Sequence, residues 1–284
     1  MSTLADRAHE VDLGEARVVF STRNGGVSAG PYRSLNLGIL TDDEADRVAE
    51  NRRRLAAEAG LDPRRVAMGW QVHGTDIATW EEPPADGHDG FASPGAELAK
   101  VDGHTTTAPG LGLLVLVADC LPVALAGGGR VAMLHCGWRG LAAGMIENAL
   151  QRFEEAPVAA VGPGIGRCCY EVGPEVLDAF SGLEGVADGR MLDLRAVAQR
   201  KLSDCGVAGV THVDLCTACN QDLFFSHRRD DGVTGRQCGL AWLTECPASS
   251  QTSTRVTSAA TWSACASASP PPAAIRPRWS YARR

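Results

Sequence analysis

The stretch LGLLVLVADCLPVALAGGGRVAMLHCGWRG, residues 111–140, predicts the centre of the fold. Its apolar runs have the length of strands, and the two runs beside the glycines alternate less than a strand with one exposed face would. We therefore expect buried strands at PVALAG and RVAMLHCG, joined by a hairpin turn at residues 127–129. This arrangement brings Cys120 and His135 to one edge of a sheet.

The segments on either side of this stretch alternate between strand and helix patterns. Further strands are expected at residues 16–20, 66–80 (with a turn at His73 and Gly74), 158–166, 207–216 and in the last apolar run before residue 244. Helices are expected at 43–60, 141–155, 174–180 and 193–206, and loops at 81–100 and 101–110. Because several strands are neighbours in sequence, the pattern predicts the α/β (α+β) class, with mixed sheets flanked by helices.

Composition and charge limit the classes of protein to consider. Of the 284 residues, 44% are hydrophobic and 21% charged, which is ordinary for a globular protein. No apolar run approaches the roughly 20 residues that cross a bilayer, and the N-terminus shows no apolar signal region. The net charge of −7 argues against nucleic-acid binding. We expect a cytoplasmic protein with a single domain over residues 1–244 and a disordered Ser-, Ala- and Pro-rich tail over 245–284.

Three residues at expected strand ends carry side chains suited to chemistry: His73, Cys120 and His135. Two imidazoles and a thiolate form a sensible zinc site with a fourth position left for water or substrate. The same residues could instead form a hydrolase dyad, with Cys120 as nucleophile and a histidine as base. A third possibility is that Cys120 is a small buried apolar residue. Residue spacing alone leaves these alternatives open.

The remaining cysteines and two arginines give weaker signals. We interpret the lone CxxC pair, Cys216 and Cys219, and the adjacent Cys168 and Cys169 as structural. Four further thiols are expected to be buried apolar residues, as free cysteines usually are: Cys136, Cys205, Cys238 and Cys246.

Arginine is the expected binder of any phosphate, since Lys100 and Lys201 are the only lysines in the chain. Arg23 lies beside a glycine-rich loop, and Arg139 precedes the expected helix at 141–155. Either position suits an oxyanion, although a surface arginine in a turn explains each equally well.

Taken together, seven stretches resemble the YfiH or laccase-domain family, often labelled multicopper polyphenol oxidase. They occur in the family's order and cover residues 18 to about 243: STRNGGVSAGPYRSLNLG, QVHGTD, VDGHTT, VADCLPV, HCGWRG, VGPGIGRCCYEVG and CTACNQDLFFSHRRDDGVTGRQ. Two departures are visible, because Cys136 stands where alanine is more usual and His227 where tyrosine is common. Neither departure removes a ligand.

The resemblance implies a fold of mixed sheets and helices similar to the cytotoxic necrotizing factor toxins, and a zinc site at His73, Cys120 and His135. It also implies phosphorolysis of adenosine, inosine, guanosine and methylthioadenosine, and deamination of adenosine. Purine nucleosides and inorganic phosphate would then be the partners of a monomer or small homo-oligomer. We expect Arg23, and secondly Arg139, to bind phosphate, and Asp119 to carry a proton because it adjoins Cys120.

The older oxidase label implies copper, and it can be compared with the histidine content. A laccase holds several coppers with many imidazoles, including HxH pairs. This chain has seven histidines, and no two of them are separated by a single residue. A four-copper site is therefore not expected, which favours the nucleoside reaction; a Cys–His hydrolase or deamidase and a polyphenol oxidase remain the alternatives.

Overall fold

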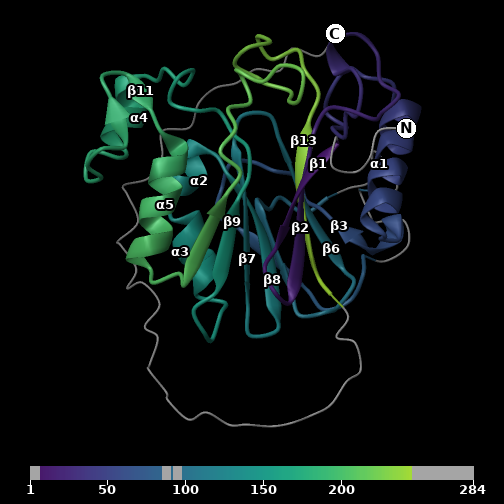
Figure 1. The fold of residues 1–284 in the computed structure, drawn as a ribbon, viewed down its shortest axis with the longest axis horizontal. Coiled ribbons are helices and arrows are strands. Elements are labelled where there is room, and N and C mark those ends of the chain that lie inside the picture. Colours follow the sequence, from purple (N-terminus) through teal and green to yellow (C-terminus); the bar gives the residue numbers. More distant parts are fainter. Residues whose placement is uncertain (1–6, 85–90, 92–97, 245–284) are drawn as a thin grey trace.

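Two β-sheets pack face to face in the computed structural model of the chain, and helices cover both outer faces (Figure 1). The structure describes residues 7–84, 91 and 98–244. The tail over 245–284, and most of the loop expected at 81–100, lie outside the described residues. No helix in the described part of the chain is long and apolar enough to cross a bilayer.

Both large sheets are mixed, as the sequence predicts. The five-stranded sheet has the order β1 (Ala8–Asp12), β2 (Ala16–Ser21), β13 (Gln237–Leu243), β6 (Gly112–Val117) and β3 (Val66–Ala67). The six-stranded sheet has the order β12 (Gly209–His212), β9 (Val158–Val161), β7 (Leu121–Gly127), β8 (Arg130–Cys136), β5 (Gly103–Thr106) and β4 (Ile77–Trp80). A small sheet pairs β10 (Ala187–Asp188) with β11 (Met191–Leu192).

The hairpin predicted at the centre of the fold is confirmed. Strands β7 and β8 pair antiparallel from Leu121 opposite Cys136 to Gly127 opposite Arg130. Gly128 and Gly129 form the turn with φ angles of 60° and 73°, which glycine adopts without a steric cost.

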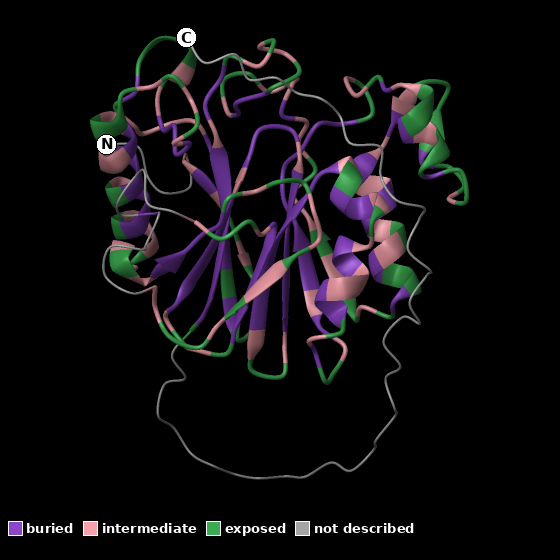
Figure 2. Cartoon of the chain, turned by 180° about the vertical axis from the view of Figure 1, so that it is seen from behind, coloured by how far each residue is buried: buried purple, intermediate pink, exposed green. Residues whose placement is uncertain are grey.

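The central strands are buried on both faces, which explains their nearly continuous apolar runs (Figure 2). One face of the hairpin packs into the space between the sheets, with Met133 beside Phe20 and Val115 in one cluster. Its other face packs under the helices α2 (Trp138–Ala142), α3 (Met145–Leu150) and α5 (Leu194–Asp204). On the far side, α1 (Ala45–Ala59) covers the five-stranded sheet through Leu55 and Ala56.

The prediction of one helix at 141–155 is wrong in detail, because the structure has two short helices in this region. Gly144 separates α2 from α3 with a φ of 92°, a left-handed conformation that interrupts a right-handed helix. As a result α2 begins at Trp138, directly after the strand that carries His135. The helices α1, α5 and the short α4 (Pro174–Asp178) lie where they are expected, and 3₁₀ turns form at Gly30–Tyr32 and Pro63–Arg65.

Three strand predictions also need correction. Residues 66–80, expected as one interrupted strand, form β3 and β4 in different sheets. The expected loop at 101–110 contains the fully buried strand β5, and β1 was not expected at all. Strand β5 has no apolar run in the sequence, because it consists of polar residues and a glycine. The threonine hydroxyls are satisfied inside the fold: Thr105 donates to the Val131 carbonyl at 3.0 Å and Thr106 to the Trp80 carbonyl at 2.6 Å.

His104 in β5 gives the fold a pH dependence. The Trp80 indole N–H donates to His104 Nδ1 at 3.1 Å, and complete burial lowers the pKa of this histidine to about 4. Since the unfolded chain binds a proton near pH 6.5 and the folded chain does not, stability is full above pH 6.5 and falls as pH drops toward 4. The expected loss is about 3 kcal/mol. His104→Asn should show a flatter profile than the wild type in urea unfolding between these pH values; parallel profiles would contradict this prediction.

Candidate metal centre

His73, Cys120 and His135 converge at one end of the six-stranded sheet. Cys120 immediately precedes β7, His135 lies near the end of the antiparallel β8, and His73 lies in the segment that leads to β4. The candidate donor atoms of the three residues all lie within 4.8 Å of one another. The two imidazole rings meet edge to face with centroids 4.8 Å apart. The fold therefore assembles the three residues that the sequence selects as ligands.

The backbone around two of these residues is strained. His73 has a φ of 61° and Asp119, next to Cys120, has a φ of 100°. Non-glycine residues adopt such left-handed conformations at a cost of the order of 1–3 kcal/mol and concentrate at functional sites. Both turns carry a ligand side chain toward the same point, so the strain coincides with the site.

Asp102 holds two of the ligands in place. Its fully buried carboxylate accepts a hydrogen bond from His135 Nδ1 at 2.8 Å, which leaves Nε2 of that ring facing the other ligands. It also accepts three backbone N–H groups, from Val72 at 3.0 Å, His73 at 2.9 Å and Gly74 at 2.8 Å. One carboxylate thus orients the His135 ring and fixes the turn that presents His73.

The charges of these groups reinforce one another. Burial by itself raises the pKa of Cys120, but His135 and His73 outweigh it and hold that pKa at about 6. Burial lowers the pKa of His135, but Cys120 and Asp102 outweigh it and raise that pKa to about 9. Burial also works against the ionised Asp102, yet hydrogen bonds from His135 and the backbone lower its pKa to about 2. The site therefore favours a thiolate at Cys120 near neutral pH.

The ligand set fits zinc. Two imidazoles and one thiolate match the donors that zinc prefers, and three protein donors are the usual number at a catalytic zinc site. A carboxylate behind a ligating histidine, as Asp102 lies behind His135, is the usual partner of such a ligand. The residues would hold a single zinc ion through the two histidines and Cys120.

Gly137 is the N-cap of α2 and lies against two of the three candidate ligands, His73 and Cys120. We call His73, Cys120 and His135 the ligand group. A Cβ atom at this position would lie 3.0 Å from Cys120 Sγ and 3.0 Å from Cδ2 of His73, tighter than most real contacts. Its φ of −76° suits any residue, so only the lack of space requires glycine here.

We expect Gly137→Ala to fold but to bind zinc more weakly by about tenfold or more, because the methyl group displaces a ligand that Asp102 holds in place. Competition with a chromogenic chelator measures the affinity. Gly182→Ala is the matched control, since a Cβ there meets nothing within 4 Å. Equal zinc affinity in the two variants would refute the steric argument.

Tyr170 lies near Cys120, and Arg228 and Arg139 lie near Tyr170. The guanidinium of Arg228 lies over the Tyr170 ring at 5.1 Å, and that of the exposed Arg139 lies over Trp138 at 4.4 Å. Burial and the negative charge of Cys120 raise the pKa of Tyr170 to about 12, despite the opposing charges of the two arginines. A neutral phenol thus lies within electrostatic reach of Cys120, and two cations lie within reach of that phenol.

Asp119 lies beside Cys120, and both of its carboxylate oxygens are engaged. Oδ1 accepts a hydrogen bond from the Thr217 hydroxyl at 2.6 Å, and Oδ2 accepts one from the Arg228 backbone N–H at 2.7 Å. These contacts tie two loops to the turn that carries Cys120. Its geometry therefore supports a positioning role, and proton transfer by Asp119 stays a prediction.

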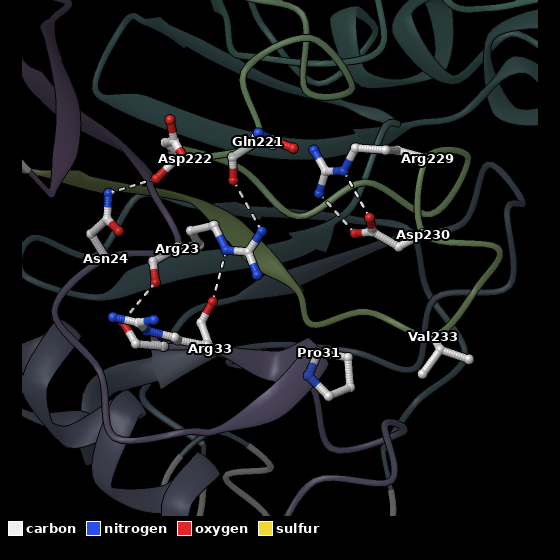
Figure 3. Close-up of a pocket in the computed structure, with 10 residues that line it drawn as sticks. Arg23, Asn24, Pro31, Arg33, Gln221, Asp222, Arg229, Asp230 and Val233 are labelled. Atoms are coloured by element: carbon white, nitrogen blue, oxygen red, sulfur yellow. Dashed lines mark hydrogen bonds and ion pairs between the residues drawn. The ribbon is translucent and has the colours of Figure 1, made fainter.

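Arg23 lies in a separate cavity of about 630 Å³ rather than among the residues named above (Figure 3). Its Nε donates to the Arg33 carbonyl at 2.7 Å, one terminal nitrogen donates to the Gln221 carbonyl at 3.0 Å, and its guanidinium lies over Phe225 at 4.5 Å. Burial and the neighbouring Arg229 lower its pKa. Of the two predicted phosphate binders, Arg139 lies two residues after Gly137 in the first turn of α2, whereas Arg23 lines this separate cavity.

The sequence predicts no functional role for Asp102, Tyr170 or Arg228. A signal existed for Asp102, because an acid stands immediately before the buried strand β5 in the stretch VDGHTT. No such signal existed for Tyr170 and Arg228, whose loops approach Cys120 only in the folded chain. The structure also brings the two cysteine pairs together, since Cys168, Cys169, Cys216 and Cys219 form a second group of donors.

Known proteins are similar to this chain in sequence and in fold. Residues 17–244 match the family described as multi-copper polyphenol oxidoreductase laccase, and the chain belongs to it. The chain is 39% identical over 236 residues to the purine nucleoside phosphorylase YfiH of Escherichia coli, covering 78% of this chain and 92% of that protein. It is 38% identical over 242 residues to the purine nucleoside phosphorylase Cgl2154/cg2365 of Corynebacterium glutamicum, covering 80% and 94%.

Solved structures agree with this assignment. YlmD from Geobacillus stearothermophilus superposes with a TM-score of 0.76 at 32% identity, covering 82% of this chain and 93% of that one. The Neisseria meningitidis protein NMB0706 superposes with a TM-score of 0.71 at 34% identity, covering 84% and 100%. The predicted resemblance to the YfiH or laccase-domain family is therefore confirmed.

Proposed function

We propose that this chain is a zinc-dependent purine nucleoside phosphorylase acting on adenosine, inosine, guanosine and methylthioadenosine. The observation that carries the proposal is the group of His73, Cys120 and His135 with Asp102 behind it, whose donors suit one zinc ion. The similarity to two purine nucleoside phosphorylases supports the reaction type.

The number and type of potential metal ligands favour one metal ion over a multicopper centre. Among residues 7–84, 91 and 98–244, two groups contain three or more potential ligands. One of these groups has two histidines and the other has none, whereas a laccase needs many imidazoles. We therefore propose zinc rather than the copper that the family description suggests.

Phosphorolysis makes and breaks one bond at the ribose. A phosphate oxygen forms a bond to C1′ while the bond from C1′ to the purine nitrogen breaks, and its electron pair leaves with the base. Bound zinc would supply Lewis-acid stabilisation of negative charge at this point. Arg139 would hold the phosphate through charge-assisted hydrogen bonds, with Arg23 as the second candidate. Trp70 and Val72, exposed beside His73, offer apolar surface to the purine.

We also propose deamination of adenosine at the same site. In that reaction the amino group at C6 leaves as ammonia and an oxygen from water replaces it, so a side chain must carry a proton. Asp119 is the proposed carrier, and each of its oxygens keeps a second lone pair beside the hydrogen bonds from Thr217 and the Arg228 backbone.

One assay tests the proposal and its alternatives. Metal-free full-length protein is loaded with zinc or with copper and incubated with adenosine, with and without phosphate, and the products are separated by chromatography. Adenine and ribose 1-phosphate that appear only with phosphate support phosphorolysis, and inosine supports deamination. Absence of all three products from folded, zinc-loaded protein would refute the proposed function.

A Cys–His hydrolase or deamidase is the second candidate, and one observation favours it. Cys120 with a lowered pKa, His135 with a raised pKa and Asp102 behind it also form a thiolate–imidazolium arrangement suited to nucleophilic attack. Chelation separates the two functions, because a dyad should keep working without metal. Turnover of an amide substrate by the metal-free protein would support the hydrolase instead.

We expect Arg139→Gln to raise the KM for phosphate about tenfold or more, while Arg23→Gln changes it less. Loss of a hydrogen bond to a charged group costs about 1.5–3 kcal/mol. Arg139 follows two residues after Gly137, which lies against Cys120 and His73, whereas Arg23 lines the separate cavity. Initial rates at varied phosphate concentration measure the effect, with the exposed Arg200→Gln in α5 as control. A larger effect for Arg23→Gln would place the phosphate in the cavity of Figure 3 instead.

A further inference from the structure

Four cysteines outside the candidate metal centre form a second donor group. Cys168 and Cys169 follow β9, and Cys216 and Cys219 follow β12, so the parallel pairing of these strands brings the two segments together. All four sulfurs lie within 4.8 Å of one another. The proposed phosphorolysis uses none of these cysteines.

The sulfur positions match a tetrahedral metal site. Zinc–sulfur bonds of about 2.3 Å in a tetrahedron place the sulfurs about 3.8 Å apart. Cys219 Sγ lies 3.5 Å from the sulfur of Cys168 and 3.4 Å from that of Cys169. Displacements of a few tenths of an ångström would therefore bring these sulfurs to the separation that zinc requires.

A disulfide accounts for this arrangement less well. Bonded sulfurs lie about 2.05 Å apart, so either pair at Cys219 would have to close by more than 1 Å. Cys219 approaches Cys168 and Cys169 equally, and no single partner is selected. A cation that contacts all four thiolates satisfies the whole group at once.

The backbone around the cysteines is organised as in a ligand site. The Gly166 N–H donates to Cys216 Sγ at 3.2 Å, a contact that favours a thiolate. The N–H of Cys169 donates to the Gly166 carbonyl at 2.9 Å, which turns the adjacent cysteines toward the second segment. Gly164 and Cys216 form a parallel bridge, so the two segments are already in register.

We propose that Cys168, Cys169, Cys216 and Cys219 bind one zinc ion as four thiolates, and that this ion fastens two loops beside the candidate metal centre. The loops meet at Asp119: Ile165 donates its N–H to the Asp119 carbonyl at 2.8 Å, and Thr217 donates its hydroxyl to the Asp119 side chain at 2.6 Å. Tyr170 follows Cys169 directly. The ion would therefore hold the turn before Cys120 without touching substrate.

Metal counting on the full-length protein tests this site. Protein is purified with a reductant in a buffer of defined metal content, and bound zinc is measured by inductively coupled plasma mass spectrometry. We expect two zinc ions in the wild type and one in Cys168→Ser/Cys219→Ser, which changes the two exposed cysteines of the group. Cys238→Ala, a buried thiol elsewhere in the core, is the matched control and should keep two.

His73→Ala separates this proposal from the proposed function, because it should empty only the first site. Loaded with cobalt as the probe metal, this variant should retain one ion and the strong thiolate-to-cobalt absorption of four sulfur ligands. Loss of all cobalt from His73→Ala, or an unchanged metal count in folded Cys168→Ser/Cys219→Ser, would overturn the proposal. So would a peptide map showing a disulfide at Cys219 in protein isolated without an oxidant.

Discussion

Cys120→Ala should lower the phosphorolysis of adenosine by at least about a hundredfold and remove zinc from the candidate metal centre. Replacing a residue that merely supports a ligand typically costs about 10–100-fold in metal affinity or activity, and Cys120 is itself one of the proposed ligands. The two histidines that remain would bind zinc with one donor fewer than the three usual at a catalytic site. Steady-state rates and metal content measure the two effects on the same preparation.

Cys136→Ala is the matched control for this experiment. Cys136 is a completely buried thiol in the core cluster beneath α2 and α3, and burial raises its pKa well above the usual value. It adjoins His135 in sequence, yet the donor group contains Cys120 and not Cys136. We expect this variant to keep zinc and activity. Equal losses in the two cysteine variants would show that thiol removal acts through folding rather than through the metal.

The sequence predicts those parts of the fold whose signals are local. The hairpin β7–β8 follows from two apolar runs and three glycines, and α1 follows from periodicity that stops at Gly60. Strand β5 was missed because its Thr hydroxyls are satisfied only by distant partners, such as the Val131 carbonyl. The broken helix at Gly144 was missed because a single glycine inside a helical pattern does not reveal its φ.

The two groups of potential metal ligands also differ in how far the sequence predicts them. His73, Cys120 and His135 could be selected because each ends an apolar run, and family resemblance then favoured zinc. The four-cysteine group could not be selected, since neither the adjacent pair nor the lone CxxC predicts its partner. Only the parallel pairing of β9 with β12 brings Cys169 and Cys216 together. Asp102 has a visible position before β5, but three of its four side-chain hydrogen bonds come from the folded turn at residues 72–74 and the fourth comes from His135 in β8.

Asp102→Asn should weaken zinc binding by about 10–100-fold, which is the usual cost of losing a carboxylate behind a ligating histidine. The wild-type carboxylate accepts four hydrogen bonds, whereas an amide has one acceptor oxygen and a nitrogen that only donates. If the amide oxygen keeps His135 and His73, the amide nitrogen faces the N–H groups of Val72 and Gly74. These contacts are part-buried, and a fully buried donor left unpaired costs about 1–3 kcal/mol, so each should cost up to that much stability.

Asp76→Asn is the matched control for this variant, because Asp76 is an exposed acid of the same segment with the same change of charge. Chelator competition gives the zinc affinity, and urea unfolding of the metal-free proteins gives the stability. If Asp102 only stabilised the fold, Asp102→Asn would lose stability but bind zinc as tightly as Asp76→Asn does. We expect instead that it loses both, because the carboxylate that pairs the buried N–H groups also sets the His135 ring and the His73 turn. Zinc affinity that is unchanged between the two variants would show that the ligands are oriented by their own strands and turns.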